Sequence, residues 1–208
     1  MGHKCFISFK KEDKYFLEKI SDLLGKENIT GKSLDEWIDS EDIDYVISVI
    51  REKYMKNTSV TIFLIGEHSS ENEGFDEEGR PKNAFIKREL QATLYDGKGF
   101  RRSGLLGIVL PSMYTKIYGG QYYCNKCDSN HNYVYINPNT TIKEFSANYY
   151  LKPIEHGCKN VYDEDGRFCV LVRYDDFIQP GNAEKYIEQA YQKTQEDISN
   201  YVHWRDLK

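Results

Sequence analysis

Two uninterrupted apolar runs constrain this chain most: residues 59–66, SVTIFLIG, and residues 104–111, GLLGIVLP. Each run ends at a glycine or a proline, and its length is that of a strand buried on both faces. Such strands belong to parallel sheets that are covered by helices on both sides. Between them, residues 83–95, NAFIKRELQATLY, place Ile86, Leu90 and Leu94 on one helical face. The order strand, helix, strand therefore predicts an α/β protein.

The same alternation continues toward both ends of the chain. Two further strands are predicted at 4–9 (KCFISF) and 166–174 (GRFCVLVRY). Within residues 12–28, Phe16, Ile20, Leu23 and Leu24 have the spacing of one helical face, and Gly25 stands where a glycine would end the helix. Further helices are predicted at 40–57 with Ser40 as N-cap, and as one long closing helix over 182–204. We expect one domain over residues 1–208, with a mostly parallel, flavodoxin-like sheet and helices on both faces. Residues 112–165, rich in Tyr and Asn, are expected to form an irregular insertion.

Composition limits the classes of function. The chain has 208 residues, 39% of them hydrophobic, which supports a packed core, and its net charge of −5 argues against a nucleic-acid partner. No run of about 18 apolar residues predicts a membrane span. The first residues lack the layout of a signal peptide, and the five cysteines are an odd number. A cytoplasmic protein with reduced thiols is the expectation.

Chemistry-bearing side chains gather at one edge of the predicted sheet. Parallel α/β sheets bind ligands beyond the carboxyl ends of their strands. Ser8 and Phe9 end the first strand, and His68 follows the strand at 59–66. Glu89 lies early in the next helix, whose start is near the same edge. A carboxylate, a hydroxyl and an imidazole are therefore expected to converge on one cleft.

A local excess of positive charge surrounds Glu89, although surface charges of this kind usually form only a solvated helix face. Between Gly79 and Arg102 there are seven cations and two acids, a local balance of +5. Such a basic collar in an acidic protein suits a small anionic ligand, such as a nucleotide pyrophosphate. The cations are Arg80, Lys82, Lys87, Arg88, Lys98, Arg101 and Arg102. Of these, Lys87 and Arg88 are expected to lie outside the helix face on which Glu89 meets the cleft.

A resemblance to a known family joins these features. KCFISFKKED, at the N-terminus, resembles the first strand and turn of TIR domains. The pattern IDYVISVIREKYMKNTSVTIFLIGEHS, followed by FIKREL, is similar to the TIR-like branch found as stand-alone proteins in bacterial Thoeris anti-phage systems. The resemblance covers roughly residues 4–110, with a weaker fit of the last strand and helix. It implies the TIR version of the flavodoxin-like fold.

The resemblance also implies a reaction and a set of residues. In that family the glutamate that maps onto Glu89 is catalytic, and the enzyme cleaves the bond between nicotinamide and ribose in NAD+. The pocket positions map onto Phe6, Ser8 and Phe9, and Phe85 stands where relatives commonly have Trp. Relatives often have a small hydroxyl residue at the position of His68.

NAD+ is thus the implied substrate, and catalysis requires no further cofactor. The implied product is a cyclic ADP-ribose-type signal that activates a separate effector, with a phage trigger and self-association as further implied partners. Whether water or an atom of the same molecule attacks the ribose stays open.

The cysteines suggest a separate site. YCNKCDSNH places Cys124, Cys127 and His131 in a C-x2-C-x3-H pattern, and EHGC adds His156 and Cys158. A structural zinc ion held by Cys124, Cys127, His156 and Cys158 is one interpretation. A tight turn with unligated thiols is the other. Cys5 and Cys169 lie in predicted strands and are expected in the core.

Two other classes of function stay open. A catalytically silent TIR adaptor would act by protein–protein assembly. A flavodoxin-like nucleotide sensor would use the same sheet edge, but the chain lacks a Gly-rich phosphate loop of the G-x-x-x-x-G-K type. Glu89 with an aromatic residue at position 85 favours the enzyme.

Overall fold

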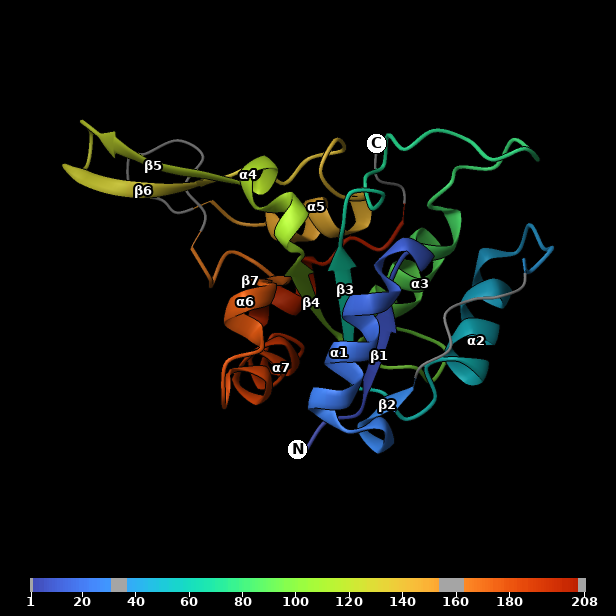
Figure 1. Ribbon diagram of the computed structural model, residues 1–208. Helices are drawn as coiled ribbons and strands as arrows, with labels where there is room; N and C mark the ends of the chain where they lie inside the picture. The colour runs from blue at the N-terminus through green and yellow to red at the C-terminus, as the bar shows by residue number, and fades with distance from the viewer. Residues whose placement is uncertain (1, 31–36, 154–162, 206–208) are drawn as a thin grey trace.

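The computed structural model describes residues 2–30, 37–153 and 163–205, and its centre is a five-stranded sheet (Figure 1). The strand order is β2-β1-β3-β4-β7, and all four pairings are parallel. This confirms the predicted α/β class with a mostly parallel sheet. The strands are β1 (Cys5–Ser8), β2 (Ile29–Thr30), β3 (Val60–Ile65), β4 (Gly104–Val109) and β7 (Val170–Arg173).

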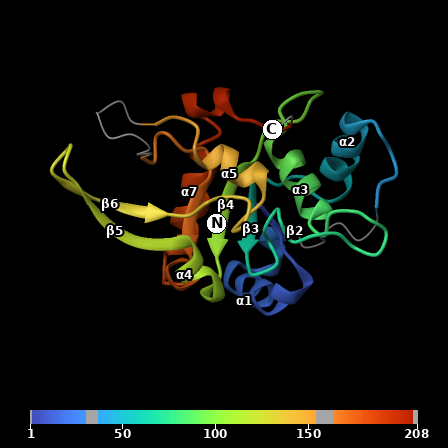
Figure 2. The same ribbon diagram turned by 90° about the horizontal axis from the view of Figure 1, so that it is seen from above.

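Helices cover both faces of the sheet (Figures 1 and 2). One face is covered by α1 (Lys14–Leu24), α6 (Tyr174–Phe177) and α7 (Asn182–Gln192). The other is covered by α2 (Ile43–Lys53), α3 (Ala84–Leu94), α4 (Tyr114–Ile117) and α5 (Lys143–Tyr149). Short 3-10 turns are η1 (Lys11–Asp13), η2 (Lys26–Asn28), η3 (Pro111–Met113) and η4 (Asp197–Tyr201).

Strand β3 shows why its sequence is apolar apart from Thr61. Ile62 and Leu64 face the core beneath α1 and α7, whereas Phe63 and Ile65 face the core beneath α3 and α5. All four side chains are fully buried. A strand covered on both faces has no solvent side that would favour polar residues, so the run is continuous rather than alternating.

Helix α1 ends where the sequence places its stop. Gly25 follows the last helical residue with φ +81°, a conformation that glycine adopts without strain. Ile20 and Leu24 are buried as expected. Leu23 is 46% exposed, so its predicted place on the inner face is wrong. The buried stripe is narrower than the sequence suggests.

The N-cap of α2 is Asp42, two residues later than predicted. Its Oδ1 accepts hydrogen bonds from the backbone N–H groups of Asp44 at 3.0 Å and Tyr45 at 3.2 Å. Ser40 instead accepts from the backbone N–H of Asp42 at 3.1 Å. Both residue types cap helices well. Asp42 is the cap because it directly precedes Ile43, the first helical residue, and its side chain faces the free N–H groups of the first turn.

The predicted closing helix is too long. Helix α7 ends at Gln192, and the chain continues through turns into η4. Lys193, the C-cap residue, is 4% exposed, and its side chain donates to the backbone carbonyl of Glu164 at 2.8 Å. No glycine or proline marks this end in the sequence. Beneath α7, a side chain at Gly104 would meet the backbone carbonyl of Ala190, so the glycine allows helix and strand to approach closely.

Residues 112–153 are more ordered than the predicted irregular insertion. Strands β5 (Tyr118–Cys124) and β6 (Ser129–Val134) form an antiparallel hairpin that projects from the body of the molecule (Figures 1 and 2). Helix α5 then returns to the core, where Phe145 and Tyr149 are buried against the sheet. This part of the chain therefore belongs to the packed core as well as to the surface.

Within the described residues, no helix is both long and apolar enough to span a membrane.

Candidate active site

Glu89 and Ser8 meet at the edge of the sheet where the sequence predicted a cleft. Ser8, the last residue of β1, donates from Oγ to Oε2 of Glu89 at 2.6 Å. Ser8 is fully buried and Glu89 is 1% exposed. Because the two residues are 81 positions apart, this bond joins the end of β1 directly to α3. A short, buried bond to a carboxylate fixes the carboxylate's direction.

A second buried bond sets the rotation of α3 on the sheet. The hydroxyls of Thr93 and Thr61 lie 2.8 Å apart, and the Thr93 hydroxyl also donates to the backbone carbonyl of Glu89 at 2.9 Å. Thr61 is in β3 and Thr93 is one turn beyond Glu89 on α3. With Ser8, these contacts tie α3 to two adjacent strands and hold Glu89 toward the edge.

A cleft of about 290 Å³ opens above Glu89. Its walls come from the end of β1 with η1 and from the start of α3. This volume lies at the lower limit of ordinary small-ligand pockets, so it suits one end of a dinucleotide rather than the whole molecule. The lining residues are Phe9, Lys10, Lys11, Glu12, Lys82, Phe85, Ile86 and Glu89.

Three lysines give the cleft its positive charge. Lys10 and Lys11 follow β1, and Lys82 precedes α3. Lys10 donates to the backbone carbonyl of Lys82 at 2.9 Å, which joins the two walls. Burial lowers the pKa of Lys10, against the attraction of Glu12 and Glu73. Neither Lys10 nor Lys11 belongs to the basic collar predicted from the sequence, although both lie directly after the strand end.

The predicted basic collar is largely dispersed, and of its seven cations Lys82 is the one that lines this cleft. Lys98 pairs with Asp44 at 3.0 Å, and Arg80 pairs with Asp76 at 3.0 Å. Arg101 and Arg102 line a different cavity, near the start of β4. These cations are close in sequence but not in space, because α3 and the loop after it direct their side chains to different parts of the surface.

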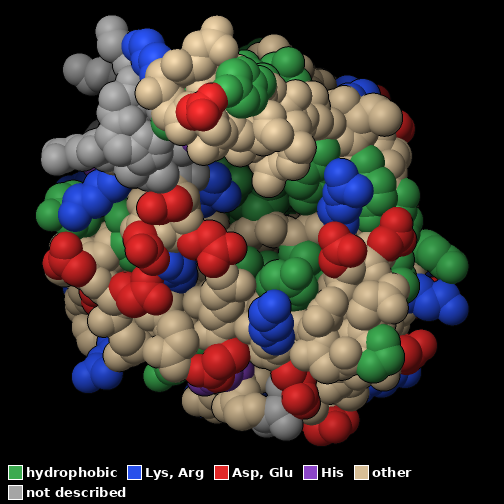
Figure 3. Space-filling model, turned by 90° about the vertical axis from the view of Figure 1, so that its left-hand side faces the viewer, with side chains coloured by type: hydrophobic (Ala, Val, Ile, Leu, Met, Phe, Trp, Pro, Cys, Tyr) green, Lys and Arg blue, Asp and Glu red, His purple; other side chains and the backbone are tan. Residues whose placement is uncertain are grey.

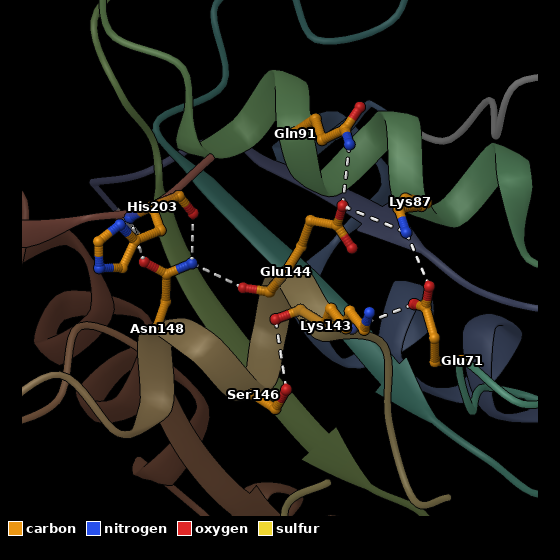
Figure 4. A network of polar contacts seen from close by, with 8 residues as sticks. All are labelled: Glu71, Lys87, Gln91, Lys143, Glu144, Ser146, Asn148 and His203. Atoms are coloured by element: carbon orange, nitrogen blue, oxygen red, sulfur yellow. Dashed lines mark hydrogen bonds and ion pairs between the residues drawn. The ribbon is translucent and has the colours of Figure 1, made fainter. Parts of the chain in front are cut away.

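On its other flank, α3 is held by α5 (Figure 4). Gln91 donates to Oε1 of Glu144 at 2.8 Å, and Lys87 lies 3.8 Å from the same oxygen and 2.7 Å from Glu71. Glu144 is 1% exposed, and burial raises the pKa of its carboxyl, which Lys87 opposes. Lys87 therefore lies outside the cleft, as predicted, and helps to position the helix that carries Glu89.

Phe6 does not form a wall of the cleft, contrary to the prediction. It is fully buried against α2 and α3, in a cluster with Ile50, Ala92 and Tyr95. Phe6 and Ser8 share one face of β1, but α3 runs antiparallel to the strand. Phe6 therefore packs against Ala92, one turn beyond Glu89, and lies too deep to reach a ligand.

Phe85 does line the cleft, and it contacts a tryptophan that sequence reasoning did not single out. The rings of Phe85 and Trp37 meet edge to face at 5.6 Å between centroids. The guanidinium of Arg88 lies 3.4 Å from the centroid of Trp37 and donates to the carbonyl of Ile38 at 2.9 Å. Arg88 therefore lies outside the cleft, as predicted, and orders the segment behind Phe85.

His68 is near the same sheet edge but is not among the described residues that line the cleft. Its Nδ1 lies 2.6 Å from a carboxylate oxygen of Glu73, and this hydrogen bond raises the pKa of His68. About half of its side chain is exposed. The expected convergence of carboxylate, hydroxyl and imidazole is thus met for Glu89 and Ser8 and not for His68.

The predicted zinc ligands fall into two groups. Cys124, Cys127 and His131 come together at the end of the β5–β6 hairpin, where their ligand atoms all lie within 4.8 Å of one another. His156 and Cys158 lie outside the described residues. Cys5 and Cys169 are buried in the core, as predicted.

Asp13 is a second part-buried carboxylate at this sheet edge. It packs against Gly66 just after β3, at a distance that leaves no room for a side chain at position 66. Its Oδ2 is buried and has no hydrogen-bond partner within the described part of the chain. Burial raises the pKa of Asp13 to about 6; Glu12 adds to this rise and His68 opposes it.

We expect Asp13→Asn to become more stable relative to the wild type as the pH rises. The folded pKa is raised, so Asp13 contributes stability below its ordinary pKa of 3.8, and this contribution is lost as the pH rises through about 6. A shift of about two units corresponds to at most ~3 kcal/mol, which solvent screening reduces to about 1 kcal/mol. Urea unfolding of both proteins near pH 4 and near pH 8 measures it. An equal difference in unfolding free energy at both pH values would contradict the shift.

The comparisons with known proteins agree with this geometry. The family model described as Thoeris protein ThsB, TIR-like domain, matches residues 6–113. Among curated proteins, none has a sequence that matches the chain. The matched segment contains β1, β3, α3 and β4, and with them Ser8, Glu89 and the whole lining of the cleft. It makes up just over half of the 208 residues, so the chain belongs to the family of TIR-like domains of Thoeris protein ThsB.

Proposed function

We propose that the chain is an enzyme of anti-phage defence that cleaves the bond between nicotinamide and ribose in NAD+. The observation that carries this proposal is the buried carboxylate of Glu89 at the foot of the cleft, with its direction held by Ser8. Membership of the TIR-like Thoeris family supports the same reaction. NAD+ is the substrate, and the proposed chemistry needs no other cofactor.

One carboxylate is sufficient for this reaction because the leaving group is already activated. The C1′–N bond breaks, its electron pair goes to the positively charged ring nitrogen, and nicotinamide leaves neutral. No general acid is needed, in contrast to ordinary glycosidases, which use two carboxyl groups. Positive charge builds up on the ribose, where a fixed carboxylate stabilises it in the transition state.

The rest of the cleft suits the remaining parts of the substrate. Phe9 and Phe85 offer aromatic surface on which the nicotinamide ring can stack. Lys10, Lys11 and Lys82 are near enough to the opening to bind the pyrophosphate, which carries two negative charges. The volume of about 290 Å³ places the nicotinamide riboside end inside and the adenosine end outside.

The fate of the ribose decides the product. Attack by water gives linear ADP-ribose and releases a proton. Attack by a hydroxyl or ring nitrogen of the same molecule also releases a proton and gives a cyclic ADP-ribose, which contains one water molecule less than the linear product. We propose the cyclic product, which would act as a diffusible signal for a separate effector. The family assignment supports this choice.

Mass spectrometry of extracts from phage-infected cells tests the proposal. Cells that express the chain are expected to lose NAD+ after infection and to accumulate equal amounts of nicotinamide and of a cyclic ADP-ribose, which is lighter than linear ADP-ribose by one water molecule. Infected cells allow for a phage-derived trigger or for self-association that a purified protein would lack. Intact NAD+ in protected, infected cells would instead favour the adaptor function.

A further inference from the structure

The end of the β5–β6 hairpin brings three metal-ligating side chains together. Cys124 is the last residue of β5, Cys127 lies in the connecting turn, and His131 is in β6. Their Sγ and ring nitrogen atoms all lie within 4.8 Å of one another, with 3.0 Å between Cys127 Sγ and His131 Nε2. The turn and the strand pairing bring the three side chains together, because all three residues belong to one hairpin.

We propose that Cys124, Cys127 and His131 bind one zinc ion that fixes the end of this hairpin. In tetrahedral coordination, zinc–sulfur bonds of about 2.3 Å and zinc–nitrogen bonds of about 2.0 Å place ligand atoms roughly 3.5–3.8 Å apart. The three atoms are already within the range that small side-chain rotations convert to this spacing. Two sulfurs and an imidazole favour zinc over magnesium or calcium, which prefer oxygen ligands.

Among the described residues, His131 is the third protein donor beside the two cysteines of the zinc site predicted from the sequence. That prediction combined Cys124 and Cys127 with His156 and Cys158, which lie outside the described residues. The ring of His131 contacts the ring of Tyr122, its direct cross-strand partner, at 5.4 Å between centroids. This contact holds the imidazole on the same side of the hairpin as the thiols. Water can complete the fourth coordination position.

In the part of the chain that the structure describes, few buried side chains stabilise the hairpin. Most side chains of β5 and β6 are exposed, including those of Tyr122, Tyr123 and Tyr133. Figure 3 shows the side of the molecule from which the hairpin projects. On that face, charged side chains of both signs surround a hollow that contains hydrophobic side chains. A two-stranded hairpin without a core is marginally stable in water. A metal that joins its two strands would supply the missing stability, as it does in small zinc domains.

The geometry favours a metal site over a redox pair of thiols. A disulfide between Cys124 and Cys127 would use neither the imidazole of His131 nor its position. The imidazole lies 3.0 Å from the Cys127 sulfur, at hydrogen-bond distance, so a zinc ion could replace this hydrogen bond by moving the two atoms slightly apart. The two thiols would be ligands as thiolates and would lose their protons when zinc binds.

Zinc content of the full-length protein tests the proposal. After expression with zinc and gel filtration with a reductant, the wild type is expected to retain about one zinc per chain, as fits a structural site. Cys124→Ser, Cys127→Ser and His131→Ala should each retain less than about a fifth of that amount. Asn132→Ala is the matched control, because it changes an exposed residue next to His131 in the same strand and should retain the wild-type content.

Hydrogen exchange gives a readout besides metal content. When zinc is added to the metal-free wild type, exchange over residues 118–134 is expected to slow at least about tenfold, while β1, β3 and β4 stay unchanged. His131→Ala should show no such slowing. Since its core strands report whether the variant is folded, misfolding would be recognised in the same experiment.

Two results would overturn the proposal. A wild type without zinc, whose exchange over the hairpin does not respond to added zinc, would exclude a metal site. Full zinc content in His131→Ala, with loss in both cysteine variants, would show that His131 is not a ligand. Neither result depends on the activity toward NAD+.

Discussion

Glu89→Gln is expected to reduce nicotinamide release from NAD+ by at least about a thousandfold, the upper range for the loss of one electrostatic group. The substitution removes the negative charge that would stabilise the ribose cation in the transition state. It keeps the shape of the side chain, and the amide oxygen can still accept the hydrogen bond that Ser8 now donates at 2.6 Å. Chromatography of NAD+ and its products, on extracts of infected cells, measures the loss.

A second buried glutamate provides a matched control for this variant. Glu144 is as buried as Glu89, at 1% exposure, but it contacts the opposite flank of α3 through Gln91. Glu144→Gln therefore makes the same chemical change without touching the cleft, and activity within about threefold of the wild type is expected. Turnover by Glu89→Gln at the wild-type level would remove Glu89 from the mechanism and the proposed reaction with it.

The parts of this fold that the sequence predicts well depend on local patterns. Strand β3 is buried on both faces, and a short, nearly continuous apolar run is typical of such a strand. Helix α3 repeats its apolar residues at Ile86, Leu90 and Leu94, and all three are buried as predicted. Because β3 precedes α3, the position of Glu89 near the sheet edge follows from chain order alone.

The contacts that complete the site depend on how distant segments pack. No local pattern shows that Ser8 rather than Phe6 reaches Glu89, because this depends on the direction in which α3 crosses β1. The burial of Lys193 at the end of α7 cannot be predicted locally either, since the carbonyl that accepts from its side chain belongs to Glu164. His68 lies near the predicted edge, but its imidazole is hydrogen-bonded to Glu73 instead of facing the cleft. The sequence does not show which acid the imidazole would contact.

Ser8→Ala is expected to lower kcat about 10- to 100-fold and to change KM by no more than about threefold. A hydrogen bond to a charged group contributes about 1.5–3 kcal/mol, and here it orients the carboxylate that stabilises the transition state. Ser8 is a positioning residue, because it is fully buried and is not among the described residues that line the cleft. Substrate binding should therefore be affected little. Initial rates over a range of NAD+ concentrations separate the two constants.

Thr61→Val separates this role from simple packing. It removes another buried hydroxyl that ties the sheet to α3, the one 2.8 Å from the Thr93 hydroxyl, but leaves the side chain of Glu89 untouched. Both variants should lower the melting temperature by a few degrees, while Ser8→Ala alone should lower kcat. If both variants lose stability to the same extent and keep the wild-type kcat, the Ser8 hydroxyl would serve only to attach α3. A fall in kcat confined to Ser8→Ala ties the rate to the direction of the Glu89 carboxylate, because in both variants the helix has lost one tie to the sheet.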